Sequence, residues 1–293
     1  MRAGIFIVSI VAAAVPPHIP HQQTTVTVAV AVAVEHRDGR PVEGLTAGDF
    51  SLLLDGQPVT VTKATYDSTS PNVAVLLDLT ASNVWLGGAS IRNHVLAVFS
   101  DNTAVIVGTF GRVVRWSGGF STDRSEQRRL LQTALGLRPE ERTGPSPVWD
   151  VVSDALAALH SRQGRKAVLL ITDGQTTGNR LGLADVADQA IASAVPVNIV
   201  FSGSSGLLNQ ALGMTARVLP DRPLSQLAGA TGGYFSAILK DKADALRMTA
   251  RAMRSVYRLE FMAPSKPGFQ RLLVATKNSD HLPRAPMGFK SGS

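Results

Sequence analysis

The stretch that decides the fold reads VAVLLDLTAS and spans residues 73–82. Its apolar run continues without interruption up to Asp78, which is typical of a strand buried on both faces of a parallel sheet. Similar apolar runs recur at 104–110, 167–171 and 197–201, and segments with helical spacing lie between them. Strands that alternate with helices predict right-handed crossovers and helices on both faces of one sheet. The sequence therefore predicts an α/β domain over residues 70–256, built on a doubly wound, mostly parallel central sheet.

The helices of this domain are expected from their apolar spacing and their end signals. Asp123 is a candidate N-cap for a helix that carries Leu130, Leu131 and Leu135. A short strand near the edge of the sheet is expected at 113–116. The other expected helices cover residues around 91–99, 148–159, 184–194, 224–227 and 241–255.

The segments that flank the α/β domain have the period of β-strands. Valines alternate with smaller residues from Val26 to Val34, and residues 52–54 and 59–62 flank a turn at 55–58, which predicts a hairpin. Two more strands are expected at 257–261 and 269–276, and from Asn278 onward the polar, proline-containing end is expected to be loose. We expect residues 24–69 to form a small β-module against which the C-terminal segment 257–293 packs.

The first 23 residues have the pattern of a signal peptide and leader. Arg2 precedes an apolar run from Gly4 to Val11, small residues follow at Ala12 and Ala14, and prolines come next. The alternative is a frayed apolar terminus. A signal peptide predicts a secreted or periplasmic protein, and no other segment has the roughly 18 apolar residues of a membrane-spanning helix.

Composition excludes several kinds of chemistry. The chain of 293 residues has no cysteine, which excludes disulfides, thiolate catalysis and cysteine-based zinc sites. Its net charge is +7, and Arg247, Arg251, Arg254 and Arg258 would share one stripe of a helix. No DNA- or RNA-binding motif accompanies this stripe, so we interpret it as a solvated helix face and expect no nucleic-acid partner.

Five oxygen-bearing residues follow buried strands or precede a helix. Asp78 ends the strand at 73–77, Thr80 and Ser82 follow it, Asp173 ends the strand at 167–171, and Ser146 precedes the helix at 148–159. Ligands of open parallel sheets bind beyond the carboxyl ends of the strands, where the strand order reverses. These hard oxygen donors would suit Mg²⁺. Each residue also has a structural explanation, because Asp and Ser cap helices and Thr-Asp-Gly is common in turns.

In its order and spacing, this set resembles the metal-ion-dependent adhesion site (MIDAS) of von Willebrand factor A domains. Residues 78–82 resemble the family's Asp-x-Ser-x-Ser, Ser146 before Val148-Trp149-Asp150 resembles its threonine, and Thr172-Asp173-Gly174 matches its Thr-Asp-Gly. Residues 39–50 and 227–235 are similar to segments of exported bacterial relatives. Thr80 replaces a serine and Ser146 a threonine, so both hydroxyls are kept, while Pro145 replaces a glycine.

The resemblance implies a module that holds one divalent cation, Mg²⁺ or else Mn²⁺ or Ca²⁺, and binds a protein partner without catalysis. It implies that Thr80 and Ser82 ligate the ion directly, that Ser146 does so in at least one state, and that Asp78 and Asp173 act mostly through water. An acidic residue of the partner would complete the coordination. Two alternatives stay open, a haloacid-dehalogenase-like phosphatase, which needs an acid where Thr80 stands, and a scaffold protein whose metal site does not function.

Overall fold

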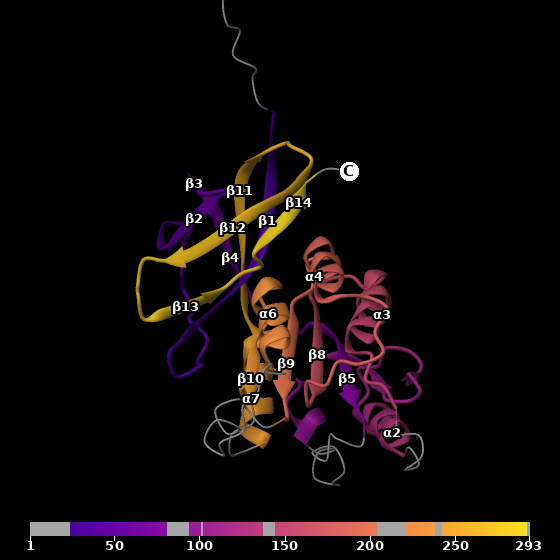
Figure 1. Ribbon diagram of the computed structural model, residues 1–293. Helices are drawn as coiled ribbons and strands as arrows, with labels where there is room; N and C mark the ends of the chain where they lie inside the picture. Colours follow the sequence, from indigo (N-terminus) through magenta and orange to yellow (C-terminus); the bar gives the residue numbers. More distant parts are fainter. Residues whose placement is uncertain are drawn as a thin grey trace, which may run out of the picture.

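The computed structural model describes residues 24–80, 94–100, 102–136, 144–203, 221–237 and 242–291 (Figure 1). The predicted signal segment, residues 1–23, lies outside these ranges. The described strands form one six-stranded sheet and two four-stranded sheets. None of the helices described is long and apolar enough to cross a membrane.

The six-stranded sheet is the centre of the α/β domain. Its neighbouring strands are all parallel except the pair at the β7 edge, which is antiparallel. This arrangement confirms the predicted fold class. The strands, in order across the sheet, are β10 (Phe235–Ala237), β9 (Val197–Phe201), β8 (Lys166–Thr172), β5 (Asn72–Asp78), β6 (Ala104–Phe110) and β7 (Arg115–Trp116).

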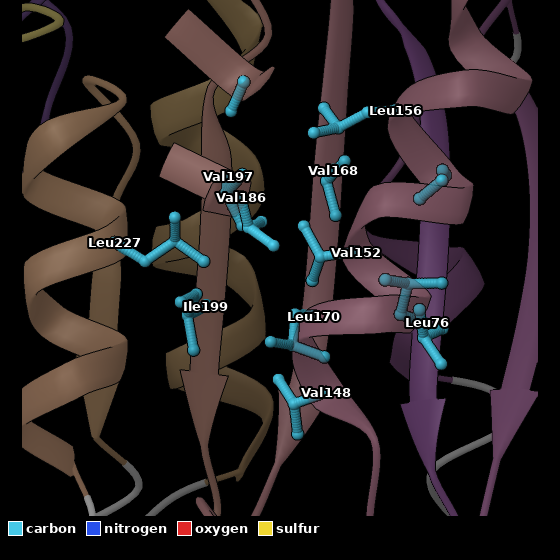
Figure 2. Packing of buried hydrophobic residues seen from close by; sticks show 14 of the residues in the cluster. Leu76, Val148, Val152, Leu156, Val168, Leu170, Val186, Val197, Ile199 and Leu227 are labelled. Carbon is cyan, nitrogen blue, oxygen red and sulfur yellow. The ribbon is translucent and has the colours of Figure 1, made fainter. Parts of the chain in front are cut away.

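Helices cover both faces of this sheet because its central strands are apolar on both sides. All seven residues of β5 are buried. One face packs against α3 (Val148–His160), α4 (Leu183–Ala192) and α6 (Asp221–Ala230), and Figure 2 shows Val148 and Val152 of α3 beside Leu170 of β8. The other face packs against α2 (Arg124–Leu135), α7 (Lys242–Arg254) and the helical residues 94–97. Asp123 caps α2 as predicted, since its side chain accepts a hydrogen bond from the Glu126 N–H.

The strand order reverses between β5 and β8. From β5 the chain continues to β6 and β7 on one side, and it then returns to β8 and β9 on the other side. Ligands bind at the carboxyl ends of strands that flank such a reversal. These ends point away from the two smaller sheets (Figure 1), so the edge predicted to bind a ligand lies at the far end of the domain from them.

The two four-stranded sheets pack on each other around a second core. Their inward side chains include Val32, Phe50, Leu52, Leu259 and Phe261, all buried. One sheet has the order β13 (His281–Arg284), β1 (Thr25–His36), β11 (Val256–Pro264), β4 (Val61–Asp67); the other has the order β14 (Gly288–Ser291), β12 (Gly268–Thr276), β2 (Phe50–Leu54), β3 (Gln57–Val59). Each sheet therefore combines two N-terminal with two C-terminal strands, and we call the two sheets together the sandwich.

The hairpin expected at 52–62 is shorter than predicted. β2 and β3 are joined by Asp55 and Gly56, whose φ angles of 49° and 83° suit a tight two-residue turn. β3 ends at Val59, and Val61 starts β4 in the opposite sheet. The expected second arm, 59–62, is thus divided between two sheets, because the chain crosses the sandwich at Thr60 and Val61 is buried in its core.

The C-terminal segment was wrongly expected to be loose from Asn278. β13 pairs with residues 33–36 of β1, and β14 pairs with residues 268–271 of β12. Pro286 lies between them, where the chain crosses from one sheet to the other. These segments are strands because β1 and β12, which are distant in sequence, offer them free edges. The local sequence has no apolar pattern that predicts this pairing.

The predicted arginine stripe is also shorter than expected. α7 ends at Arg254, and Arg258 lies on β11, where it pairs with Glu260 at 2.7 Å. The Arg254 guanidinium donates to the Val98 carbonyl at 3.0 Å. The four arginines therefore do not form one continuous helix face.

Candidate metal centre

Asp78 lies at the reversal of strand order and is fully buried. Three hydroxyls donate hydrogen bonds to its carboxylate. Thr172 donates to Oδ2 at 2.6 Å, Thr80 donates to Oδ1 at 2.7 Å, and Ser146 donates to Oδ2 at 3.1 Å. Residues from β5, from the end of β8 and from the start of α3 thereby meet at one carboxylate.

Register explains the contact between Asp78 and Thr172. The parallel pairing of β5 with β8 places Leu77 opposite Ile171, so the next residues of the two strands face each other at the sheet edge. The sequence predicted Thr172 only as part of the Thr-Asp-Gly motif and not as a contact of Asp78. Its position could have indicated this contact, because Thr172 is the last residue of β8 and directly precedes Asp173.

The structure decides against a capping role for the Ser146 side chain. The N-cap of α3 is Pro147, and no side chain caps this helix. Ser146 is buried, and its hydroxyl is directed to Asp78 instead. The side chain of Ser146 thus belongs to the polar cluster at the sheet edge.

Asp173 follows Thr172 and is nearly buried. Its Oδ1 accepts a hydrogen bond from the Gln175 N–H at 3.1 Å, so the turn role considered for this residue is present. The pKa of the Asp78 carboxyl lies above its ordinary value, chiefly because burial disfavours the charge and further because of the nearby Asp173 charge. The hydrogen bonds from Thr172 and Thr80 oppose this rise without cancelling it. Two neighbouring carboxylates at this end of the sheet can attract a cation.

The loop after Asp173 is held against the start of α3. Ser146 and Thr177 exchange two hydrogen bonds of 2.9 Å, from the Ser146 N–H to the Thr177 hydroxyl and from the Thr177 N–H to the Ser146 carbonyl. Asp150 accepts hydrogen bonds from the N–H groups of Arg180 and Leu181 at 2.9–3.1 Å. Sequence reasoning did not identify the roles of Thr177 and Asp150. They fix the position of the loop relative to Ser146.

The chemistry of the donors fits a hard divalent cation. A hydroxyl that donates its proton to a carboxylate keeps lone pairs for a metal ion, and Mg²⁺, Mn²⁺ and Ca²⁺ prefer oxygen ligands. The described residues contain no group of three or more His, Cys, Asp or Glu side chains that could hold a metal. Two carboxylates among hydroxyls are the relevant donor set at this edge. The fifth predicted ligand, Ser82, lies outside the described residues.

Thr80 also bears on the phosphatase alternative. That chemistry needs an acid at position 80 to exchange protons with a substrate. The Thr80 hydroxyl instead donates to Asp78, as does its backbone N–H at 3.1 Å. The geometry supplies no acid at that place.

Comparisons of the structure identify the fold. A structure of proximal thread matrix protein 1 from the mussel byssus, described with a zinc occupied MIDAS motif, matches with a TM-score of 0.50 and 16% identity over 68% of this chain, which spans 50% of that chain. A von Willebrand factor type A structure from Catenulispora acidiphila matches with a TM-score of 0.49 and 13% identity over 93% of this chain and 74% of its own. No protein-family model and no curated protein matches the sequence. The match to the mussel protein, together with the strand order of the central sheet, supports a von Willebrand factor A-like α/β fold for this chain.

Proposed function

We propose that this chain is an exported, non-catalytic protein-binding module that holds one divalent cation. Its ligands are Asp78, Thr80, Ser82, Ser146 and Asp173, and the ion is Mg²⁺, with Mn²⁺ or Ca²⁺ as substitutes. The observation that carries the proposal is the convergence of three hydroxyls from distant segments on the buried Asp78 carboxylate. The mussel protein's zinc occupied MIDAS motif, on a similar fold, supports it.

Electrostatics give the ion a reason to bind. Two carboxylates close together in a buried position repel each other, and a divalent cation offsets both charges. Burial is the chief cause of the raised pKa of Asp78, and the Asp173 charge adds to it. Thr172 serves as a positioning residue because its hydrogen bond orients Asp78.

The partner completes the coordination. Mg²⁺ keeps several water molecules when proteins bind it, and an incoming carboxylate can displace one of them. We therefore propose that a protein partner supplies an acidic residue to the ion. Export would follow from residues 1–23, and the sandwich assembled from segments 24–69 and 257–293 would hold the α/β domain with its ligand edge facing outward.

Metal binding is the first test. Isothermal titration of the chain with MgCl₂, MnCl₂ and CaCl₂ should give one site per molecule for at least one of these ions. Asp78→Ala should abolish it. Because removal of a buried side chain can disturb folding, Ser146→Ala provides a milder variant that should weaken binding and leave the circular dichroism spectrum unchanged. Equal affinity in the wild type and both variants would refute the site.

Partner binding is the second test. Pull-down from a cell-envelope extract, in Mg²⁺ and in EDTA, should recover a protein only with Mg²⁺ and only with wild-type Asp78. Recovery of the same protein in EDTA would favour a scaffold whose metal site does not function. Hydrolysis of p-nitrophenyl phosphate that is lost in Asp78→Asn would overturn the non-catalytic role.

A further inference from the structure

The hairpin between β6 and β7 projects at the ligand edge of the sheet. Thr109 pairs with Arg115 at its base, so residues 110–114 form the tip. Three successive side chains of the tip are exposed, those of Arg112, Val113 and Val114, and the two valines are 42% and 36% exposed. Adjacent exposed β-branched residues beside an arginine form a small amphipathic surface, which we call the shoulder.

The shoulder adjoins the candidate metal centre on two sides. Asp78 pairs with Phe110, and the Leu79 N–H donates to the Phe110 carbonyl at 2.8 Å. On the other side, a Cβ placed on Gly144 would lie only 3.1 Å from the Cα of Arg112. Gly144 is two residues before Ser146, so the backbone of Arg112 contacts the loop that carries a proposed metal ligand.

The base of the hairpin is firmly held. The side chain of Trp116 lies on Gly108, where an added Cβ would meet its ring at 2.8 Å. Ser117 and Val107 exchange hydrogen bonds, since the Val107 N–H donates to the Ser117 hydroxyl at 3.0 Å and the Ser117 N–H donates to the Val107 carbonyl at 2.9 Å. A surface presented on a fixed base loses little conformational freedom when it binds.

Charge indicates the chemistry that the shoulder would accept. A divalent cation would offset the charges of Asp78 and Asp173, so that a basic side chain nearby could still attract an acidic partner. In the part of the chain that the structure describes, Arg112 makes no ion pair or hydrogen bond through its guanidinium. Arg180, after Asp173, is by contrast bound to Asp150 at 3.1 Å. Arg112 is therefore a described residue with an uncommitted charge beside the centre.

We infer that the shoulder determines which acidic partners bind: Arg112 pairs with a second carboxylate of the partner, and Val113 and Val114 receive an apolar side chain next to it. This inference rests on the proposed metal-dependent function. The partner segment would thus carry two acidic residues and an aliphatic or aromatic residue within a few positions. A lone acidic residue would bind the ion without engaging the shoulder.

Selection of peptides tests this inference on the full chain. A displayed library of random 12-residue peptides is panned on the wild type in Mg²⁺, and bound peptides are eluted with EDTA. We expect the eluted peptides to share one acidic residue plus a second acid and an apolar residue close to it. The selected peptide is then titrated against Arg112→Glu and against the double variant Val113→Ser/Val114→Ser.

Arg251→Glu is the matched control, because Arg251 is also exposed and lies on α7 toward its sandwich end. We expect Arg112→Glu to weaken peptide binding by about five- to tenfold and to reduce its salt dependence, while Arg251→Glu changes it less than about twofold. The Mg²⁺ affinity without peptide should be unchanged in Arg251→Glu and in the valine double variant, and it should not fall in Arg112→Glu, because an added acid beside the centre attracts a cation.

The outcomes separate the two proposals. If no eluted peptide carries an acidic residue, or no peptide is eluted by EDTA, the metal-dependent function fails and this inference fails with it. If acidic peptides are selected but Arg112→Glu and the valine double variant bind them as tightly as the wild type, the function stands and the shoulder is refuted.

Discussion

The hydroxyl of Thr172 donates a hydrogen bond of 2.6 Å to Oδ2 of Asp78 and so joins the carboxyl ends of β8 and β5. The same Thr172 oxygen accepts a hydrogen bond from the Gly174 N–H at 3.1 Å. A single buried hydroxyl thereby orients the carboxylate at the candidate metal centre and starts the loop that follows β8.

Replacement of this hydroxyl should lower the stability of the folded protein. Thr172→Val is expected to lower the free energy of unfolding by about 1–3 kcal/mol, because a buried carboxylate loses a donor and a buried N–H loses an acceptor. Urea denaturation at pH 7 measures it. Thr109→Val is the control, since Thr109 on β6 is as fully buried but its hydroxyl has no hydrogen-bond partner among the described residues. It should be neutral or stabilising, and equal losses in both variants would contradict the assigned role of Thr172.

Asp150 should make the stability of the protein depend on pH. Burial tends to raise the pKa of its carboxyl, but hydrogen bonds from Leu181 and Arg180 and the Arg180 charge outweigh this and hold the pKa below its ordinary value of 3.8. A carboxyl whose pKa is lower in the folded state stabilises the fold above its unfolded pKa, and it loses this effect as the pH falls through the folded pKa.

Asp150→Asn is therefore expected to lower the free energy of unfolding at pH 7 by about 1–3 kcal/mol. The difference from the wild type should narrow as the pH falls below about 4. Chemical denaturation across this range measures both effects. Asp154→Asn, one turn along α3, should not lower stability, because Asp154 accepts no hydrogen bond from the described residues and partial burial raises the pKa of its carboxyl. A pH-independent difference for Asp150→Asn would refute the electrostatic explanation.

Gly178 should be intolerant of a side chain for two separable reasons. Its φ of +71° disfavours other residues, and an added Cβ would lie 2.5 Å from the Cβ of Pro145, next to Ser146. Gly164 has a similar φ of +78° with nothing within 4 Å. Gly164→Ala should therefore show the backbone strain alone, about 1–2 kcal/mol, in thermal unfolding.

Gly178→Ala should lose more stability than this and should also weaken Mg²⁺ binding in a calorimetric titration, because the loop that holds Ser146 must shift. If the two alanine variants lose the same stability and bind Mg²⁺ equally, the contact between Gly178 and Pro145 does not position the centre.

The ion pair of Glu35 with Arg284 should stabilise the sandwich and its contact with the α/β domain. The guanidinium binds both carboxylate oxygens at 2.6 and 2.8 Å, the two side chains are only 7% and 19% exposed, and Arg284 lies 4.9 Å over the ring of Tyr234. Glu35→Ala leaves a nearly buried cation without its partner, so we expect a loss of about 3–5 kcal/mol.

The comparison for this variant is Asp280→Ala, which breaks the Arg37–Asp280 pair, whose side chains are both 72% exposed. That loss should be about 0–1 kcal/mol in guanidinium denaturation. A similar cost in both variants would mean that burial gives the Glu35–Arg284 pair no special weight.

Much of the fold was predictable because buried strands and helices have characteristic patterns of apolar residues in the sequence. The uninterrupted apolar runs of β5, β6, β8 and β9 require a sheet covered on both faces, and each run was located to within two residues of its strand. Asp123 correctly predicted the start of α2, because its side chain caps the helix. The positions of Asp78 and Asp173 at strand ends likewise predicted a shared edge, because parallel strands align their carboxyl ends.

Other features depended on contacts between residues that are distant in sequence. β13 and β14 are short and polar, and they are strands because β1 and β12 offer them free edges. Val59 and Val61 look alike in a β pattern, yet they belong to opposite sheets. The local sequence does not predict these pairings, because the strand that lies alongside each segment decides them.

The candidate metal centre also has features that the sequence predicts and features that depend on distant contacts. Composition and period were enough to predict which oxygens are available and at which strand or helix end each one stands. The folded contacts were needed to show that Ser146 donates to Asp78 while Pro147 occupies the N-cap of α3, and that Thr172 takes part. Hydroxyl orientation depends on strand register and loop packing to a fraction of an ångström, and these are set only when the whole sheet has assembled.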